Sequence, residues 1–373
     1  MKRVLFYTAN GVGLGHLRRN QLIAEELRKR KIEIVLTTSS LSPQILGRFF
    51  DHLVKLEPFT EKLDDDELAY LKARTKNEKR LLAAVKKFKP DLIVGDFHLN
   101  RHRFIFYPLK SVLDKYPIKA VFIWRLDSLK KLLTDIKKLG DKLKYFNKVI
   151  LPHSPMELSC FKPQYGFEVI GPIFKKINRS KLSDCRRKHN ISPNDFVLTV
   201  TFGAGGKLKG YCGSPAEAVK NFINIYPKLK ENITSLKTIL IAGPYLRKYP
   251  KKRISGLKII GFEKDLPELI RLSNLVVSSA GYNTGNEIIA AKTPAVLVPL
   301  KRSGNEQVKR AEFFEKLGVA ETAKSFSSKE LFKKILSCRS RLKEMKNNFK
   351  NFSDWGYGNK KAAEIILKEL NEK

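Results

Sequence analysis

A histidine lies where a glycine-rich turn passes into a helical segment. The apolar run Val4–Ala9 predicts a strand, Asn10–Gly15 a turn, and helical spacing begins at His16. The positive end of a helix dipole disfavours an imidazolium, so His16 is expected to be neutral, as a general base must be. A histidine without chemistry at a helix start explains the position equally well. The glycines that would let a ligand approach this backbone are Gly11, Gly13 and Gly15.

A second group of small and polar residues follows the apolar run Leu275–Ser278. The turn at Gly281 exposes the N-terminus of the next predicted helix to a phosphate, and Thr284 adds a hydroxyl donor. Glu287 lies one turn later, where it could accept hydrogen bonds from ribose hydroxyls or simply complement the helix dipole. The next predicted helix begins with Glu306 and Gln307, whose side chains could hydrogen-bond the hydroxyls of a sugar.

A third glycine-rich loop follows the predicted strand Phe196–Phe202. It lacks the spacing of a nucleotide-hydrolysing P-loop, and the first loop lacks the acidic partner of a dinucleotide site. The loop fits a diphosphate, and an ordinary tight turn fits it as well. Its glycines are Gly203, Gly205 and Gly206.

Two carboxylates end predicted strands of the first half. Asp96 closes the run Leu92–Asp96, and Asp127 follows the run Ala120–Trp124. Either could assist His16 or contact an acceptor, although aspartates are also common turn formers. Asp64–Asp66 resembles a metal-binding acidic motif but is interpreted as a helix start, so no metal site is predicted.

Apolar strands alternate with amphipathic helices along the whole chain, which predicts parallel sheets covered on both faces. The alternation breaks at Gly171-Pro172, where a basic, polar stretch begins, and then resumes. We therefore predict two doubly wound domains, residues 1–172 and 173–350, with a ligand cleft between them. Residues 351–373 are expected to form a C-terminal helix.

The 373 residues carry a formal charge of +36 and are 42% hydrophobic, enough for two cores. The charge suits nucleic acid, an anionic membrane or a phosphorylated ligand, but no nucleic-acid-binding motif accompanies it. Neither a signal peptide nor a membrane-spanning run is recognised, so a cytoplasmic protein is expected. Basic residues that could attract an anionic membrane or acceptor are Arg18, Arg19, Arg101, Arg103, Lys130 and Lys131.

The run SSAGYNTGNEIIAAKTPAVLVP, residues 278–299, with GNEQVKRAEFFEKLG, residues 304–318, resembles the nucleotide-sugar motif of family 28 glycosyltransferases. GVGLGHLRRNQLIAEEL, residues 11–27, resembles the acceptor-side glycine loop of that group. The resemblance implies the GT-B fold, in which two Rossmann-like, doubly wound α/β domains face a cleft and the C-terminal helix returns to the N-terminal domain.

The resemblance also implies roles for individual residues. Gly281 and Thr284 would contact the donor diphosphate and Glu287 the ribose, while His16 would be the catalytic base. Glu306 and Gln307 would face the donor sugar, although the family often has other residues at the first of these positions. The remaining donor-side residues are Ala280 and Asn283, together with the glycines of the loop after residue 202.

The resemblance implies an inverting enzyme that needs neither metal nor cofactor. It would move N-acetylglucosamine or another hexose from a UDP-sugar to an acceptor hydroxyl, including a lipid-linked one, at the inner face of the cell membrane. A nucleotide-sugar hydrolase or epimerase on the same fold is the nearest alternative. A non-catalytic sugar-nucleotide-binding subunit is another, although a chain carrying both glycine loops argues against it.

Overall fold

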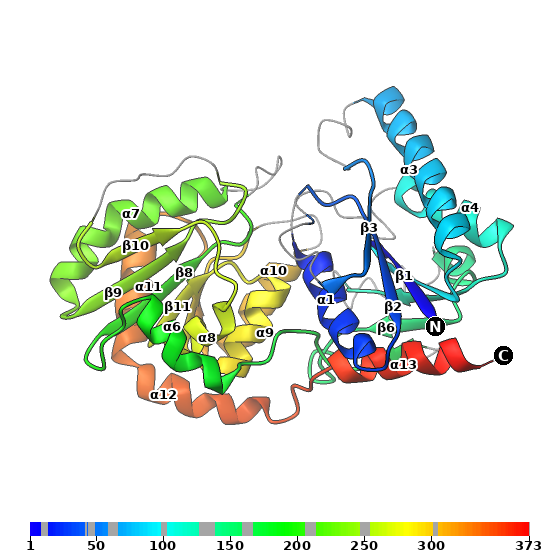
Figure 1. Cartoon of the computed structure of the whole chain (residues 1–373). Coiled ribbons are helices and arrows are strands. Elements are labelled where there is room, and N and C mark those ends of the chain that lie inside the picture. Colours follow the sequence, from blue (N-terminus) through cyan, green and yellow to red (C-terminus); the bar gives the residue numbers. More distant parts are fainter. Residues whose placement is uncertain are drawn as a thin grey trace. The chain divides into compact units, whose positions relative to one another are not determined.

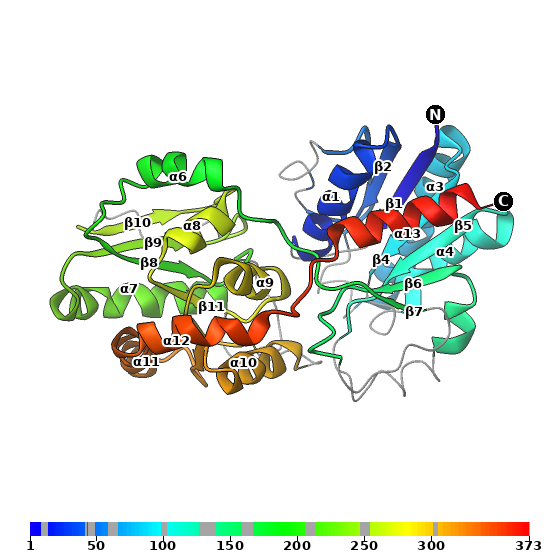
Figure 2. The same cartoon turned by 90° about the horizontal axis from the view of Figure 1, so that it is seen from below.

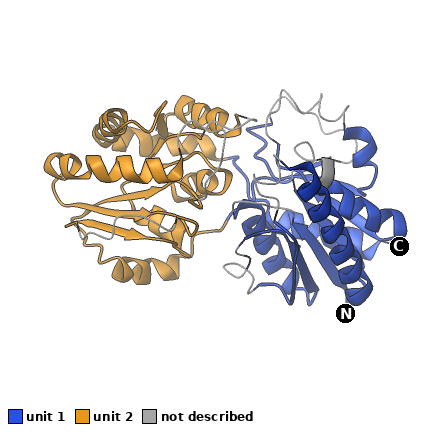
Figure 3. Ribbon diagram, turned by 90° about the horizontal axis from the view of Figure 1, so that it is seen from above, with its two compact units in different colours: residues 1–174, 354–373 blue, residues 175–353 orange. Residues whose placement is uncertain are grey.

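The computed structural model describes residues 1–8, 14–41, 43, 49–58, 66–97, 103–126, 139–158, 167–205, 214–246, 254–300 and 305–372. The chain forms two compact units (Figure 3). Unit 1 contains residues 1–174 and 354–373, and unit 2 contains residues 175–353. Each is an α/β domain around a parallel sheet, which confirms the predicted fold class (Figure 1).

The sheet of unit 1 has seven parallel strands in the order β3-β2-β1-β4-β5-β6-β7. The order reverses between β1 and β4, the point at which open α/β sheets bind their ligands. The strands are β1 (Arg3–Thr8), β2 (Glu33–Thr38), β3 (His52–Lys55), β4 (Leu92–Asp96), β5 (Lys119–Ile123), β6 (Lys148–Leu151) and β7 (Phe167–Val169).

Alternate residues of these strands enter two cores on opposite faces of the sheet, as buried parallel strands require. Val4 and Phe6 pack with one pair of helices, α1 (Gly15–Arg28) and α13 (Asn359–Asn371). Leu5 and Tyr7 pack with the other pair. That second pair is α3 (Glu67–Phe88) and α4 (Arg103–Lys115).

The C-terminal helix α13 belongs to unit 1 and lies along α1 (Figure 2). Two chain segments meet where it begins. Gly358 donates its N–H to the Pro172 carbonyl at 2.8 Å, and a Cβ at Gly358 would lie 2.3 Å from the Gly171 carbonyl oxygen. The Asn359 side chain bonds both backbone groups of Phe174, at 3.1 and 3.0 Å. The break seen in the sequence at Gly171-Pro172 is therefore a place where the backbone comes into close contact with the chain before α13.

Unit 2 has six parallel strands in the order β10-β9-β8-β11-β12-β13, with its reversal between β8 and β11. Helices cover both faces, because alternate residues such as Val197 and Leu198 enter separate cores. The strands are β8 (Phe196–Thr201), β9 (Leu236–Ile241), β10 (Leu257–Ile260), β11 (Leu275–Ser278), β12 (Ala295–Leu297) and β13 (Ala320–Thr322). The helices are α6 (Leu182–Lys188), α7 (Pro215–Asn232), α8 (Leu266–Leu272), α9 (Tyr282–Ala291), α10 (Glu306–Lys316), α11 (Ser328–Ser340) and α12 (Leu342–Asn347), with 3-10 turns η3 (Arg179–Lys181) and η4 (Asn348–Phe352).

The structure adds elements that the pattern did not predict. The strands β7 and β13 have three residues each, too few to show an alternation. The basic stretch after residue 175, in which no strand was expected, contains the short helix α6, held by the buried Cys185. The sequence also predicts a helix near residues 42–50, but most of these residues lie outside the described ones.

Candidate active site

The topology of unit 1 brings His16 and Asp96 together, although 80 positions separate them in the chain. β1 and β4 are neighbours, paired in register from Val4 opposite Leu92 onward, and both end at the same edge of the sheet. β1 leads into α1, whose second residue is His16, and Asp96 is the last residue of β4. The switch point of the sheet therefore carries an imidazole and a carboxylate.

His16 and Asp96 form a buried hydrogen-bonded pair. Nδ1 of His16 lies 2.6 Å from Oδ1 of Asp96, and the two side chains are 8% and 0% exposed. Since an ionised carboxylate only accepts hydrogen bonds, the proton of a neutral His16 resides on Nδ1. Nε2 then carries the lone pair that can accept a proton. This is the arrangement in which a histidine accepts a proton and a carboxylate holds its tautomer.

Arg19 is a third member of this cluster that the sequence did not reveal. Its Nε donates to Oδ2 of Asp96 at 3.0 Å, and a terminal nitrogen donates to Oδ1. The same nitrogen lies 2.9 Å from Nδ1 of His16, but it cannot donate there while Nδ1 carries its proton. Arg19 is 1% exposed, so its assignment as a membrane-attracting residue was wrong. It is the buried counter-ion of Asp96.

The pKa values of the pair move in the directions that a base and its orienting carboxylate need. Burial lowers the pKa of His16, and the charges of Arg19 and Arg125 lower it further, against an opposing pull from Asp96. Burial alone would raise the pKa of Asp96, but Arg19 and His16 outweigh it and bring the value to about 2. Near neutral pH the cluster therefore holds a neutral imidazole beside a carboxylate.

The other predicted residues of unit 1 are only partly described. Gly11, Gly13 and Asp127 lie outside the described residues. Gly15 is exposed, and a Cβ added there would meet no atom within 4 Å among the described parts of the chain, so packing does not require a glycine. The chain just before position 127 is held by His153, whose Nε2 accepts from the Leu126 N–H at 2.9 Å, a contact that the sequence did not suggest.

In unit 2 the switch point lies between β8 and β11. The loop after β8 holds Gly203 and Gly205, both with positive φ, at 90° and 76°. A Cβ at Gly205 would lie 2.7 Å from the Ala242 carbonyl oxygen, so packing alone accounts for that glycine. Gly203 is exposed, and its φ alone favours glycine. Gly206 lies outside the described residues.

The turn after β11 presents the N-terminus of α9. Its N-cap is Gly281, which has no side chain that could accept from the first N–H groups of the helix. Ala280 is buried, while Asn283 and Thr284 are half-buried. Oδ1 of Asn283 is buried and has no hydrogen-bond partner among the described residues, and as an amide oxygen it can only accept. The donors that this turn offers to an anion are the first backbone N–H groups of α9.

Glu287 is 5% exposed and is the sixth residue of α9. The helix dipole acts mainly within the first turn, so dipole complementation explains this carboxylate less well than it did from sequence alone. Glu306 and Gln307 begin α10, whose N-cap Asn305 has the left-handed φ of 52°. Oε1 of Gln307 accepts from the Leu300 N–H at 2.9 Å, which leaves the amide nitrogen as its donor for a sugar hydroxyl.

Residues 212–366 match the model of the glycosyltransferase family 28 C-terminal domain. The protein is a glycosyltransferase. A processive diacylglycerol β-glucosyltransferase of Bacillus cereus (strain AH187) is 24% identical over 78% of this chain and 71% of its own length. The spinosyn forosaminyltransferase SpnP has 14% identity and a TM-score of 0.70 over 100% of both chains. MurG of Acinetobacter baumannii has 14% identity and a TM-score of 0.61 over 99% of this chain and 100% of its own. These structures share the GT-B fold with the glycosyltransferase.

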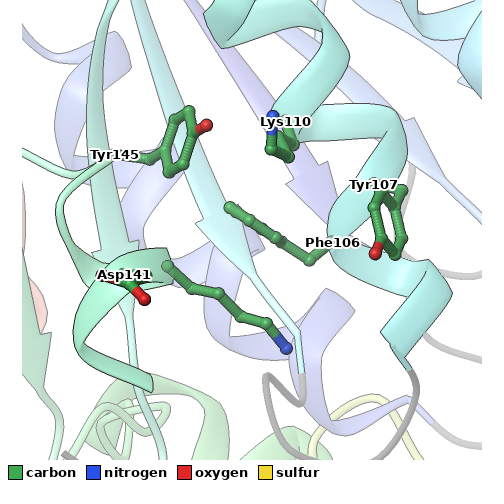
Figure 4. Close-up of a pocket in the computed structure, with 6 residues that line it drawn as sticks. Phe106, Tyr107, Lys110, Asp141 and Tyr145 are labelled. Carbon is green, nitrogen blue, oxygen red and sulfur yellow. The ribbon is translucent and has the colours of Figure 1, made fainter. Parts of the chain in front are cut away.

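The glycosyltransferase also has a pocket of about 410 Å³ in unit 1, beside α4 (Figure 4). Phe106 is 3% exposed, and its ring lies 6.3 Å from that of Phe97, the residue that follows Asp96. The ammonium of Lys110 is held by Asp114. The pocket is lined by Phe106, Tyr107, Lys110, Asp141, Lys142 and Tyr145.

Two further expectations concern metals and membranes. Among the described residues, no group of three or more His, Cys, Asp or Glu side chains could hold a metal ion. Asp66 caps α3 by accepting from the Ala69 N–H at 2.9 Å, as its interpretation as a helix start predicted. No helix in the described part of the glycosyltransferase is long and apolar enough to cross a bilayer.

Proposed function

We propose that this glycosyltransferase moves a hexose, such as glucose or N-acetylglucosamine, from a UDP-sugar to a hydroxyl of a lipid or lipid-linked acceptor, with inversion. The observation that carries the donor half is the N-terminus of α9, with a glycine as its N-cap and the buried Glu287 one turn later. The N–H groups at Tyr282–Thr284 would bind the diphosphate, and Glu287 would accept from the ribose hydroxyls. Glu306 and Gln307 would hold the sugar.

The acceptor half rests on the His16–Asp96 pair. Nε2 of His16 would take the proton of the acceptor hydroxyl as its oxygen attacks the anomeric carbon. The bond from that carbon to the phosphate oxygen breaks, and its electron pair leaves with the UDP. The N–H groups of α9 would stabilise the charge that develops on the diphosphate, which requires neither a metal nor another cofactor. A single displacement inverts the anomeric centre.

The donor site can be tested with a thermal-shift panel of nucleotide sugars. We expect a UDP-sugar to raise the melting temperature, and we expect Glu287→Ala to reduce that shift strongly, since one or two charge-assisted hydrogen bonds are worth about 1.5–3 kcal/mol each. Glu312→Ala is the matched control, because Glu312 is exposed on α10. A shift of equal size in both variants would remove Glu287 from the donor site.

The acceptor class rests on two observations. The relative named above acts on diacylglycerol, and unit 1 has a pocket with three aromatic side chains in its lining, suited to part of an amphipathic molecule. We expect sugar transfer to diacylglycerol in anionic vesicles, with the enzyme sedimenting with them at low salt and less at high salt. Tyr107→Ala should raise KM for the lipid but not for the donor.

Product analysis separates this proposal from its alternatives. Free sugar released at the same rate with and without lipid would indicate a hydrolase, and an isomerised donor would indicate an epimerase. Donor binding without any turnover on lipid or lipid diphosphate acceptors would favour a binding subunit. Absence of sedimentation with anionic vesicles at low salt would contradict membrane association.

A further inference from the structure

Arg310 connects α10 to the turn that begins α9. Its side chain is buried, with 6% of the residue exposed. NH1 donates to the Ala280 carbonyl at 2.8 Å, and the guanidinium carbon lies 5.6 Å from the centroid of the Tyr282 ring. The stem packs on Gly285, where a Cβ would lie only 3.0 Å from Cδ of the arginine. One side chain thus contacts residues on both sides of the N-cap Gly281.

Two other described hydrogen bonds are formed within the turn that Arg310 contacts. Gly281 donates its N–H to the Ser279 carbonyl at 2.7 Å, and the Ser278 hydroxyl donates to the same carbonyl at 2.8 Å. Gly281 has no side chain, and a Cβ there would meet only Ser279 Oγ, at 4.0 Å, among the described residues. Among the hydrogen bonds described for this turn, the one from Arg310 fixes the carbonyl just before the N-cap. The direction of the first N–H groups of α9 depends on the orientation of the peptide between Ala280 and Gly281.

Arg310 also lies one helical turn after Glu306, at the i+4 spacing that places two residues on the same face of a helix. The side chain of Arg310 therefore links α10 to the first turn of α9. A guanidinium suits this task better than an ammonium, because its planar group can donate in plane to a carbonyl and still lie over an aromatic ring.

We propose that Arg310 is a positioning residue of the donor site: it holds the Ser279–Gly281 turn so that the N–H groups of α9 meet the donor pyrophosphate, and it sets α10 in register with them. The inference rests on the proposed binding of a UDP-sugar at α9. It assigns Arg310 no contact with the substrate.

The test compares two arginines that bond opposite ends of the same helix. Arg271 donates from NH1 to the Ala291 carbonyl at 2.9 Å, at the C-terminal end of α9. Arg310→Met and Arg271→Met each remove one bond from a guanidinium to a backbone carbonyl, and both are expected to lower the melting temperature. Only Arg310→Met should weaken binding of the UDP-sugar in calorimetry, by about tenfold.

Steady-state kinetics adds a readout that loss of stability does not move. Arg310→Met should raise KM for the donor about tenfold and leave kcat at saturating donor within about twofold. Arg310→Lys keeps the charge and should raise KM for the donor by about threefold. It is the variant to use if Arg310→Met does not fold. Equal donor affinity in wild type, Arg310→Met and Arg310→Lys would overturn the inference. A loss of donor affinity in Arg271→Met as large as that in Arg310→Met would also overturn it. A wild-type protein that binds no nucleotide sugar would instead overturn the proposed function, and the inference with it.

Discussion

Replacing His16 by alanine is expected to lower kcat for sugar transfer about a thousandfold, because the acceptor hydroxyl then loses its proton to water. Donor binding should stay unchanged, since the donor residues proposed here are all in unit 2. His52→Ala is the matched control: this histidine is also in unit 1, but its side chain is 43% exposed. Initial rates at saturating donor and acceptor measure the effect. Activity within a few-fold of wild type would exclude His16 as the base.

The pH dependence of kcat gives a second measurement of the same role. A base must be neutral, so activity is expected to fall as the pH drops through the pKa of His16. Burial places that pKa below the usual histidine value of 6.5, although the charge of Asp96 opposes the shift. Arg19 and Arg125 are the described cations that face the ring. The fall of kcat at acidic pH should therefore occur below pH 6.5 in the wild type. The residual kcat of His16→Ala should not show this fall.

Replacing Asp96 by asparagine is expected to cost about 3–5 kcal/mol of unfolding free energy, because it leaves the charge of Arg19 buried without its carboxylate. The low pKa of Asp96, about 2, means that this carboxylate stabilises the fold above its usual pKa and loses that contribution as the pH falls toward 2. Denaturant unfolding near neutral pH measures the cost. Asp91 is exposed and lies just before β4, so Asp91→Asn should lower the unfolding free energy far less.

Asp96→Asn should also lower kcat, by about a hundredfold or more, because an amide at this position no longer requires the Nδ1–H tautomer of His16. The double variant Arg19→Met/Asp96→Asn separates the two effects. Removing both charges should restore much of the stability, since no uncompensated charge remains, but it should not restore the rate. A double variant that regained wild-type activity would show that Asp96 serves only to neutralise Arg19.

The alternation of strands and helices, and the turns that end the strands, could be predicted from the sequence because apolar periodicity and glycines are local signals. The strands at Leu92–Asp96 and Leu275–Ser278 were predicted to the residue. The edge strands β7 and β13 were not, because each has three residues with a glutamate in the middle and so lacks the apolar run of a buried strand. The positions of Gly281 and Glu287 on one helix followed from the same local patterns.

The sequence by itself determined that His16 follows one strand and Asp96 ends another, since each statement concerns only neighbours in the chain. Whether the two side chains meet depended on β1 and β4 being adjacent, and only the order of strands in the folded sheet decides that. The buried bond of Arg19 to Asp96 and the bond of Arg310 to Ala280 have the same origin. A charged residue in a sequence looks solvent-exposed until tertiary packing supplies the partner that makes its burial favourable.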